Sequence, residues 1–216
     1  MTGMEPVMVE GFSVSVEPAE VRRFLGTKNG ERAAPDPRYD DLLGDCLAAA
    51  GSLISPKAMY VYAAGRELPG SRTFAALGRM AFCVCTIGAS LETEVTRLSE
   101  GGELLRAVVL DSIGSVAAEA VADHVDKRIG ADAAKEGLKT SCRASPGYGD
   151  WDIREQAAIF RLLPAERIGV RLSETFMMIP RKSISFAMHI AKEPAMLRSE
   201  NSCRACGRTD CPYRTE

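Results

Sequence analysis

The stretch Arg143-Ala-Ser-Pro-Gly-Tyr-Gly-Asp-Trp151 contains the only tryptophan of the 216-residue chain and one of its five tyrosines. Pro146 fixes one backbone dihedral angle, and the two glycines allow positive φ values and close approach of a ligand to the backbone. Tyr148 and Trp151 offer aromatic faces, and Arg143 offers a planar cation with five hydrogen-bond donors. These features together favour a ligand that carries both an aromatic base and a carboxylate. The alternative interpretation is an ordinary turn that caps the following helix.

On both sides of this stretch, hydrophobic periodicity predicts helices and strands in an irregular order. Segment 130–141 is expected to be a linker, and the last two strands are expected to form an antiparallel pair. This order favours an α+β fold, an antiparallel twisted sheet flanked by helices, over a regular βαβ alternation. The predicted helices are 18–25, 40–53, 89–100, 103–129 and 152–163, and the predicted strands are 7–16, 58–63, 82–88, 170–179 and 183–190.

The longest predicted helix, 103–129, carries an apolar stripe at helical spacing. Beside it, Asp111, Ser115 and Glu119 lie four residues apart and therefore form a polar stripe. Such a stripe is usually a solvated face, and we expect the same here. His124, in the same helix, is expected to be a surface histidine.

Composition narrows the class of protein. The chain is 46% hydrophobic and 26% charged, with a net charge of −2, which is typical of a soluble globular protein without a basic nucleic-acid-binding face. No segment reaches the roughly 18 consecutive apolar residues of a membrane span. The N-terminus lacks the pattern of a signal peptide, so we expect a cytoplasmic protein whose seven cysteines are reduced, metal-bound or catalytic.

Three of the cysteines are close together near the C-terminus, in the pattern Cys203-x2-Cys206-x4-Cys211. This spacing indicates a metal site that is one ligand short of a tetrahedral set. Cys142 or Cys46 could supply the fourth ligand. Structural zinc, an iron–sulfur cluster with a redox role, and free thiols on a tail all remain open. We therefore divide the chain into a main domain, 1–195, whose segment 1–80 is the least defined by sequence, and a cysteine-rich tail, 196–216.

Arg143-Ala-Ser-Pro-Gly-Tyr148 resembles the Arg-x-x-Pro-Gly-Tyr loop with which the activation domain of cobalamin-dependent methionine synthase binds S-adenosylmethionine. Further matches follow the same order over roughly residues 85–190. Ala118-Glu119-Ala120 is similar to the family's helix whose Glu faces the ligand. The stretch Arg171–Pro180 resembles Leu-Thr-Glu-Ser-x-x-Met-x-Pro, and Lys182–Ser185 resembles the Ser-Val-Ser that follows it. The family's aromatic contact from the C-terminal segment has no visible match here.

The resemblance implies a role for each matching residue. Arg143 would meet the carboxylate of S-adenosylmethionine, and Glu119 would face its amino group. Ser145 and Gly147 would contribute backbone groups, and Tyr148 would pack on the ligand. The resemblance thus implies that a cation, an anion and an aromatic ring surround a zwitterionic sulfonium. Two further residues would support the loop from a neighbouring strand: Ser173 and Glu174.

In that family the domain helps to rescue cobalamin oxidised to cob(II)alamin, using an electron and the methyl group of S-adenosylmethionine. The present chain has no Asp-x-His-x-x-Gly cobalamin motif and no room for homocysteine or folate barrels. The resemblance therefore implies a stand-alone methyltransferase component for methionine biosynthesis. It would act in trans on a separate corrinoid protein, such as a methionine synthase without its own activation domain.

The electron would come from a flavodoxin-like or ferredoxin-like donor, or from a cluster in the cysteine-rich tail. Two other functions remain open from the sequence. One is an iron–sulfur redox adaptor for a corrinoid methyltransferase. The other is a non-catalytic binding module with structural zinc.

Overall fold

The structure is a computed structural model that describes residues 5–25, 37–148, 151–195 and 197. None of the helices in these ranges is both long and apolar enough to span a bilayer. The helices are α1 (Pro18–Phe24), α2 (Pro37–Leu53), α3 (Ser90–Glu100), α4 (Leu104–Lys135) and α5 (Gln156–Leu162), with 3₁₀ turns η1 (Gly65–Glu67), η2 (Ile153–Glu155) and η3 (Ala165–Ile168). The strands are β1 (Val7–Val9), β2 (Lys57–Ala64), β3 (Arg79–Thr86), β4 (Lys139–Thr140), β5 (Arg171–Leu172), β6 (Met178–Ile179) and β7 (Ser183–Ala191).

Five of the strands form one sheet in the order β1-β2-β3-β7-β4, and every neighbouring pair is antiparallel. The chain thus adopts the α+β class expected from the order of its predicted elements. β3 and β7 form the centre, where Val84 lies opposite Met59 on one side and Ser185 on the other. β4 is short, so the rest of the β7 edge is free to pair with the loop that follows β4.

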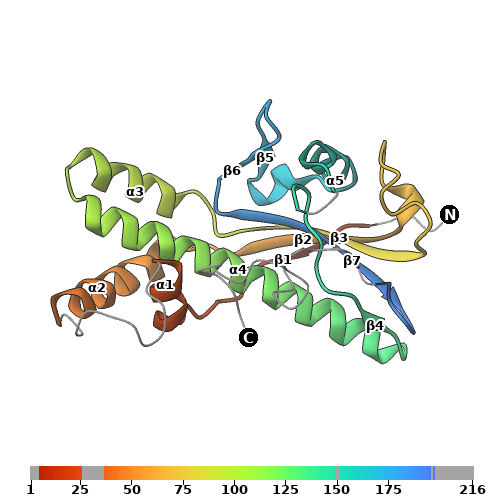
Figure 1. Cartoon of the computed structure of the whole chain (residues 1–216), viewed down its shortest axis with the longest axis horizontal. Coiled ribbons are helices and arrows are strands. Elements are labelled where there is room, and N and C mark those ends of the chain that lie inside the picture. The colour runs from red at the N-terminus through yellow and green to blue at the C-terminus, as the bar shows by residue number, and fades with distance from the viewer. Residues whose placement is uncertain (1–4, 26–36, 149–150, 196, 198–216) are drawn as a thin grey trace, which may run out of the picture.

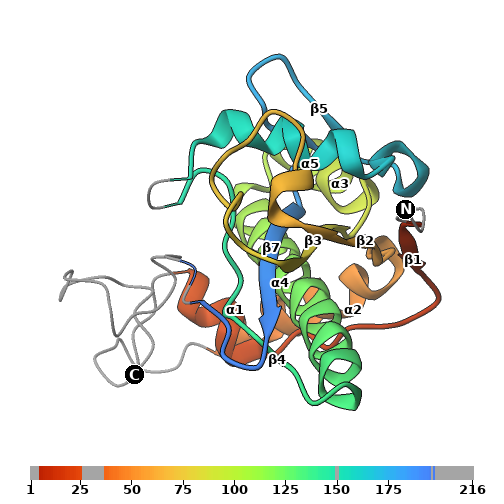
Figure 2. The ribbon, with the colours of Figure 1, turned by 90° about the vertical axis from the view of Figure 1, so that its right-hand side faces the viewer.

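Both faces of the sheet are covered (Figure 1). Because side chains alternate along a strand, β3 sends Ala81 and Cys83 into a core shared with helices α1 to α4, and Phe82 and Val84 into a second core. Figure 1 shows α4 crossing the first face and α5 with the β5–β6 hairpin on the other. The view in Figure 2 confirms that α5 and α4 lie on opposite sides of the sheet.

Helix α4 is longer than the sequence predicted. It continues to Lys135, so the first half of the expected linker 130–141 is helical and the linker prediction was wrong there. Ile129 and Ala133 are 0% and 1% exposed, so burial of the apolar stripe sustains the helix through Gly130. Tertiary packing here outweighs the helix-weakening effect of glycine.

The segment 170–179 also differs from the prediction of a single strand paired with 183–190. It folds into a hairpin in which Arg171 lies opposite Ile179 and Leu172 opposite Met178. At the turn, the backbone N–H of Met177 donates to Ser173 Oγ at 3.0 Å, and Ser173 N–H donates to the Met177 carbonyl at 2.8 Å. The polar turn residues therefore compete with an extended strand. β7 instead pairs with β3 and β4.

Candidate functional site

The loop after β4 follows the open edge of β7. Ser141 N–H donates to the His189 carbonyl at 2.9 Å, and Ala144 exchanges two backbone hydrogen bonds with Ala187, at 2.9 and 2.8 Å. This extended pairing makes successive side chains point in opposite directions. Ala144 is buried in the core on the α5 side, while Arg143 points toward α4.

Arg143 lies among three carboxylates of α4. Its Nη2 atom is 2.9 Å from Asp123 Oδ1 and 3.3 Å from Glu119 Oε2, and its Nε atom is 3.9 Å from Asp126 Oδ2. The guanidinium carbon lies 5.5 Å from the centroid of the Phe186 ring, on which it stacks. The other terminal nitrogen, Nη1, is buried and has no hydrogen-bond partner among the described residues. It is a donor that an incoming carboxylate could satisfy.

The three carboxylates give this region a negative charge that Arg143 balances only in part. Burial raises the pKa of Asp126; the Arg143 cation opposes this shift, and Asp123 adds to it. The side chains of Glu119 and Asp123 are about half exposed, at 53% and 55%. Glu119 is therefore accessible to a positively charged group.

The predicted polar stripe of α4 is not simply solvated. Lys182, whose side chain is only 12% exposed, places Nζ 2.9 Å from Asp111 Oδ1 and donates to Ser115 Oγ at 2.8 Å. Glu119, the third residue of the stripe, contacts Arg143. Lys182 directly precedes β7, and Arg143 lies in the loop that pairs with the edge of β7. The polar stripe therefore connects α4 to both of these segments.

The turn after Arg143 is closed by its own backbone. Gly147 N–H donates to the Trp151 carbonyl at 2.7 Å, and Tyr148 N–H donates to the Ser145 carbonyl at 3.2 Å. Gly147 has φ +90°, which L-residues rarely adopt. Tyr148 is 51% exposed, so its ring is available to a ligand. Trp151, in contrast, is only 4% exposed and belongs to the core on the α5 side.

A cavity of about 240 Å³ opens where this turn, α4 and the β5–β6 hairpin meet. Four of the five residues predicted to bind a ligand line it: Glu119, Arg143, Ser145 and Tyr148. Gly147 is not in the lining, and its place in the site is to shape the turn. The sequence prediction missed the rest of the wall, which consists of Pro146, Ile153, Gln156, Met177, Met178, Arg181, Ser183, Ile184 and Ser185.

Two of the missed polar residues are held together by hydrogen bonds. Ser185 Oγ donates to Gln156 Oε1 at 2.9 Å, and Gln156 Nε2 donates to the Phe176 carbonyl at 2.7 Å. Gln156 is 3% exposed. The spacing of Ser183 and Ser185 on a strand was a usable signal, because it puts two hydroxyls on one face of β7. Nothing in the sequence around Gln156 distinguished it from a surface helical residue.

The two predicted supporting residues lie at the hairpin turn and outside the cavity wall. Ser173 Oγ lies 3.0 Å from Thr175 Oγ1 and accepts the N–H of Met177, which does line the cavity. Ser173 therefore holds the turn that presents Met177. Glu174 is exposed on the same turn.

A second cavity, of about 460 Å³, lies on the other side of Glu119, between α4 and the segment that includes α1. Glu119 is the lining residue that the two cavities share. On this side His124 stacks against Phe12, with ring centroids 4.2 Å apart, so it is half-buried rather than a free surface histidine. Glu119 thus faces open space in two directions.

The predicted metal ligands Cys203, Cys206 and Cys211 lie outside the described residues. Of the two candidate fourth ligands, Cys142 is exposed and Cys46 is buried, and both are free thiols. Burial raises the pKa of the Cys46 thiol, which disfavours the thiolate needed for metal binding. Within the described residues, no group of three or more His, Cys, Asp or Glu side chains could hold a metal ion.

The first cavity combines a buried guanidinium donor, an accessible carboxylate, an exposed phenol ring, three serine hydroxyls and two thioethers. A zwitterionic amino acid with a bulky, partly aromatic substituent matches this set. The guanidinium of Arg143 and the carboxylate of Glu119 carry the charges opposite to those of the carboxylate and the amino group of such a ligand.

Comparison with known proteins identifies the family and the fold of the chain. A family model described as "Vitamin B12 dependent methionine synthase, activation domain" matches residues 75–197. The fold is similar to a solved structure described as the crystal structure of the MetH reactivation domain bound to AdoHcy. The TM-score is 0.62 at 14% sequence identity, and the match covers 91% of this chain and 81% of that chain. No curated protein matches the chain.

Proposed function

The chain belongs to the family of vitamin B12 dependent methionine synthase activation domains, and from this premise we propose that it binds S-adenosylmethionine in the cavity beside Arg143. The observation that carries the proposal is the convergence of Arg143, Glu119, Ser145 and Tyr148 on one cavity. These are the residues that the family's ligand loop and helix motifs picked out from the sequence.

Each contact follows from the chemistry of the side chains. The unpaired Nη1 of Arg143 donates to the ligand carboxylate, and Glu119 accepts from the ligand amino group. The turn, which Gly147 shapes, offers backbone groups of Ser145 to the nucleoside, and the exposed ring of Tyr148 packs on its base. The excess negative charge of Glu119, Asp123 and Asp126 favours the positively charged sulfonium.

We further propose that the bound ligand serves the reductive methylation of cobalamin on a separate corrinoid protein, such as a methionine synthase. One electron and the methyl group of S-adenosylmethionine convert cob(II)alamin to methylcobalamin and leave S-adenosylhomocysteine. The chain's residues hold the sulfonium methyl toward the partner and exclude water. A flavodoxin-like or ferredoxin-like donor supplies the electron, in the cytoplasm where the chain's thiols stay reduced.

Isothermal titration of the purified protein with S-adenosylmethionine tests ligand binding. We expect Arg143→Ala to weaken binding about tenfold or more, because the hydrogen bond to the carboxylate can no longer form. Arg154→Ala is the matched control, since Arg154 is 74% exposed and pairs only with Asp152 among the described residues. The proposal would be refuted if the wild-type protein bound no S-adenosylmethionine, or if Arg143→Ala and Arg154→Ala bound it with equal affinity. Methylation of added cob(II)alamin methionine synthase, with a chemical reductant, tests the action in trans.

The cysteine spacing supports a separate proposal, that Cys203, Cys206 and Cys211 bind zinc or an iron–sulfur cluster. Elemental analysis of anaerobically purified protein distinguishes the two metals, and visible absorption detects a cluster. We expect metal in the wild-type protein and its loss in Cys206→Ser. Equal metal content in the two proteins would refute this site without affecting the S-adenosylmethionine proposal.

A further inference from the structure

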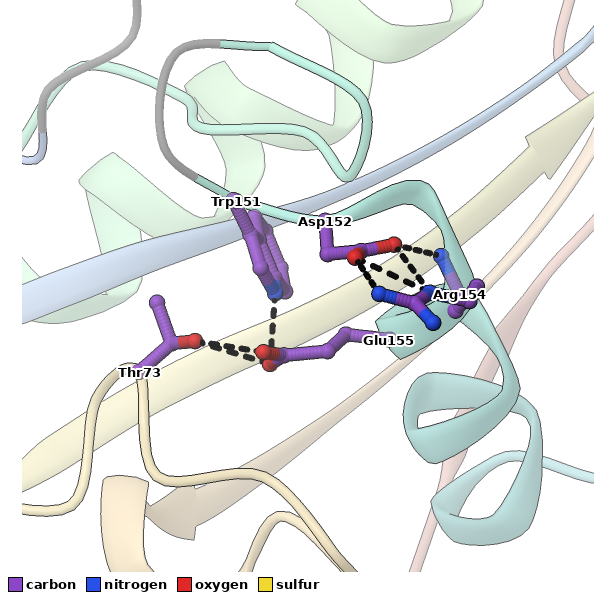
Figure 3. A network of polar contacts seen from close by, with 5 residues as sticks. All are labelled: Thr73, Trp151, Asp152, Arg154 and Glu155. Atoms are coloured by element: carbon purple, nitrogen blue, oxygen red, sulfur yellow. Dashed lines mark hydrogen bonds and ion pairs between the residues drawn. The ribbon is translucent and has the colours of Figure 1, made fainter.

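Glu155 joins two loops that are far apart in the sequence (Figure 3). Its carboxylate accepts from Trp151 Nε1 at 2.9 Å and from Thr73 Oγ1 at 2.8 and 2.9 Å. Ser71 Oγ also donates to Glu155 Oε2. Ser71 and Thr73 belong to the loop 65–78, which connects β2 to β3. Trp151 ends the turn that follows Arg143, whose described residues 145–148 and 151 we call the ligand turn. One half-buried carboxylate thus satisfies three neutral donors from both loops.

The tryptophan that Glu155 holds is also fixed by packing. The Trp151 indole meets the Phe74 ring edge-on, with centroids 4.7 Å apart and an interplanar angle of 78°. Phe74 belongs to the same loop as Ser71 and Thr73, so that loop contacts Trp151 through both an apolar face and a polar bridge. The indole N–H would otherwise be a buried donor without an acceptor.

From Trp151 the restraint passes directly to the ligand turn. The Trp151 carbonyl accepts the N–H of Gly147, and the Trp151 N–H donates to the Tyr148 carbonyl. The turn is therefore closed at one end by Ala144 pairing with β7 and at the other by Trp151. Moving Trp151 would move Gly147 and Tyr148 with it.

We propose that Glu155 is a positioning residue: by bridging Trp151 to the loop 65–78, it holds the described residues of the turn, 145–148 and 151, in the conformation that forms the cavity wall. Glu155 does not line the cavity and acts only through Trp151. The effect on S-adenosylmethionine affinity rests on the proposed function, whereas the ordering of the turn does not.

Glu155→Gln tests this role, because the amide keeps the size of the side chain but replaces one acceptor oxygen with a donor. Thr73→Val removes a single donor from the bridge and is the milder variant. Arg154→Ala is the matched control: Arg154 is the neighbouring residue and 74% exposed, and within the described part of the chain it pairs only with Asp152 (Figure 3). The Asp152 cap to the backbone N–H of Arg154 is retained in that control.

Hydrogen exchange of the peptide that contains residues 145–148 is the first measurement. We expect exchange about tenfold faster in Glu155→Gln, an intermediate rate in Thr73→Val, and the wild-type rate in Arg154→Ala. The second measurement is Trp151 fluorescence, which belongs to this residue alone because the chain has one tryptophan. We expect emission at longer wavelength in Glu155→Gln and no shift in Arg154→Ala.

The third measurement is the dissociation constant for S-adenosylmethionine, expected to rise about tenfold in Glu155→Gln. Wild-type exchange and emission in both bridge variants would overturn the positioning role. Faster exchange with unchanged affinity would overturn its connection to the ligand. If wild-type protein binds no S-adenosylmethionine but the exchange difference appears, the proposed function fails and the ordering role stands. If Glu155→Gln does not fold, Thr73→Val decides between these outcomes.

Discussion

At the scale of single residues, the shape of the ligand turn depends on Gly147. A Cβ atom at this position would lie 3.1 Å from Ile153 Cδ1, and its φ of +90° is costly for other residues. We expect Gly147→Ala to lower the free energy of unfolding by about 1–2 kcal/mol from the backbone term alone, with a further decrease from the close approach to Ile153. Urea unfolding measures this change.

Gly137→Ala is the control, because Gly137 also has positive φ, +70°, but a Cβ atom there would meet nothing within 4 Å. Only Gly147→Ala should also weaken binding of S-adenosylmethionine. Equal decreases in stability in the two variants would mean that Ile153 gives way without cost.

His189 gives the fold a pH dependence. It is 9% exposed, and its Nδ1 accepts the backbone N–H of Ala195 at 2.8 Å. Burial lowers the pKa of His189 below its ordinary 6.5, so the folded state favours the neutral ring. Above pH 6.5 the ring is neutral in both states and carries no penalty. As the pH falls from 6.5 through the lowered pKa, the unfolded state binds more protons and stability decreases.

Melting temperatures between pH 7.5 and pH 5 test this sign. We expect wild-type protein to lose more stability over this range than His189→Gln, whose side chain keeps an acceptor oxygen but does not titrate. The same pH dependence in both proteins would assign the effect to other groups.

At the scale of secondary-structure elements, close packing against α4 depends on Gly114. A Cβ atom there would lie 2.7 Å from Leu91 Cδ2 of α3 and 3.3 Å from Lys182 Cε. Gly130, in the same helix, has only Thr140 Oγ1 nearby, at 3.7 Å. We expect Gly130→Ala to stabilise the protein by up to about 1 kcal/mol through helix propensity.

Gly114→Val, in contrast, should cost about 1–3 kcal/mol by overpacking. It should also displace Lys182 from Asp111, which chemical denaturation combined with an Asp111→Asn double-mutant cycle would detect. If Gly114→Val is as stable as wild-type protein, the α3–α4 packing is looser than the distances indicate.

Helix α4 and segment 170–179 show which features of the elements the sequence predicted and which it did not. Periodicity located α4, because its apolar stripe is long and regular, but it ended the helix at 129 since Gly130 lowers helix propensity. Burial of Ala133 against the rest of the fold reversed that local preference. In segment 170–179 the β-prone residues at both ends suggested one strand. The hydrogen bonds of Ser173 that make it a hairpin depend on side-chain geometry that periodicity does not describe.

At the scale of the whole molecule, the ligand loop was recognisable because its unusual residues are contiguous in sequence. The opposing wall was not, since it comes from α5, the β5–β6 hairpin and β7, which meet only in the folded chain. Glu119 was predicted because its helix carries its own motif, 24 residues before Arg143, and it lines the same cavity as the loop. Gln156 and Glu155 have no such motif. The role of Gln156 follows from its partners Phe176 and Ser185, and the role of Glu155 follows from its partners Ser71 and Thr73.

The rim of the cavity indicates where a partner protein would dock. Among the described residues, Tyr148, Ile153, Met177 and Ile179 are large apolar side chains that are 36–57% exposed, and the first three line the cavity. Ile179 lies next along the hairpin, outside the lining. A cluster of this kind beside a binding site is typical of an interaction surface. Under the proposed function, it faces the corrinoid protein.

Ile179→Glu tests this orientation without altering the cavity wall. We expect the concentration of cobalamin-loaded methionine synthase needed for half-maximal methylation to rise about tenfold, because the new carboxylate would have to be desolvated at the interface. The dissociation constant for S-adenosylmethionine should not change, since Ile179 does not line the cavity. Leu105→Glu is the matched control, because Leu105 is equally apolar and 63% exposed but lies at the start of α4. A similar rise in both variants would place the docking surface elsewhere or show that added charge alone weakens the encounter.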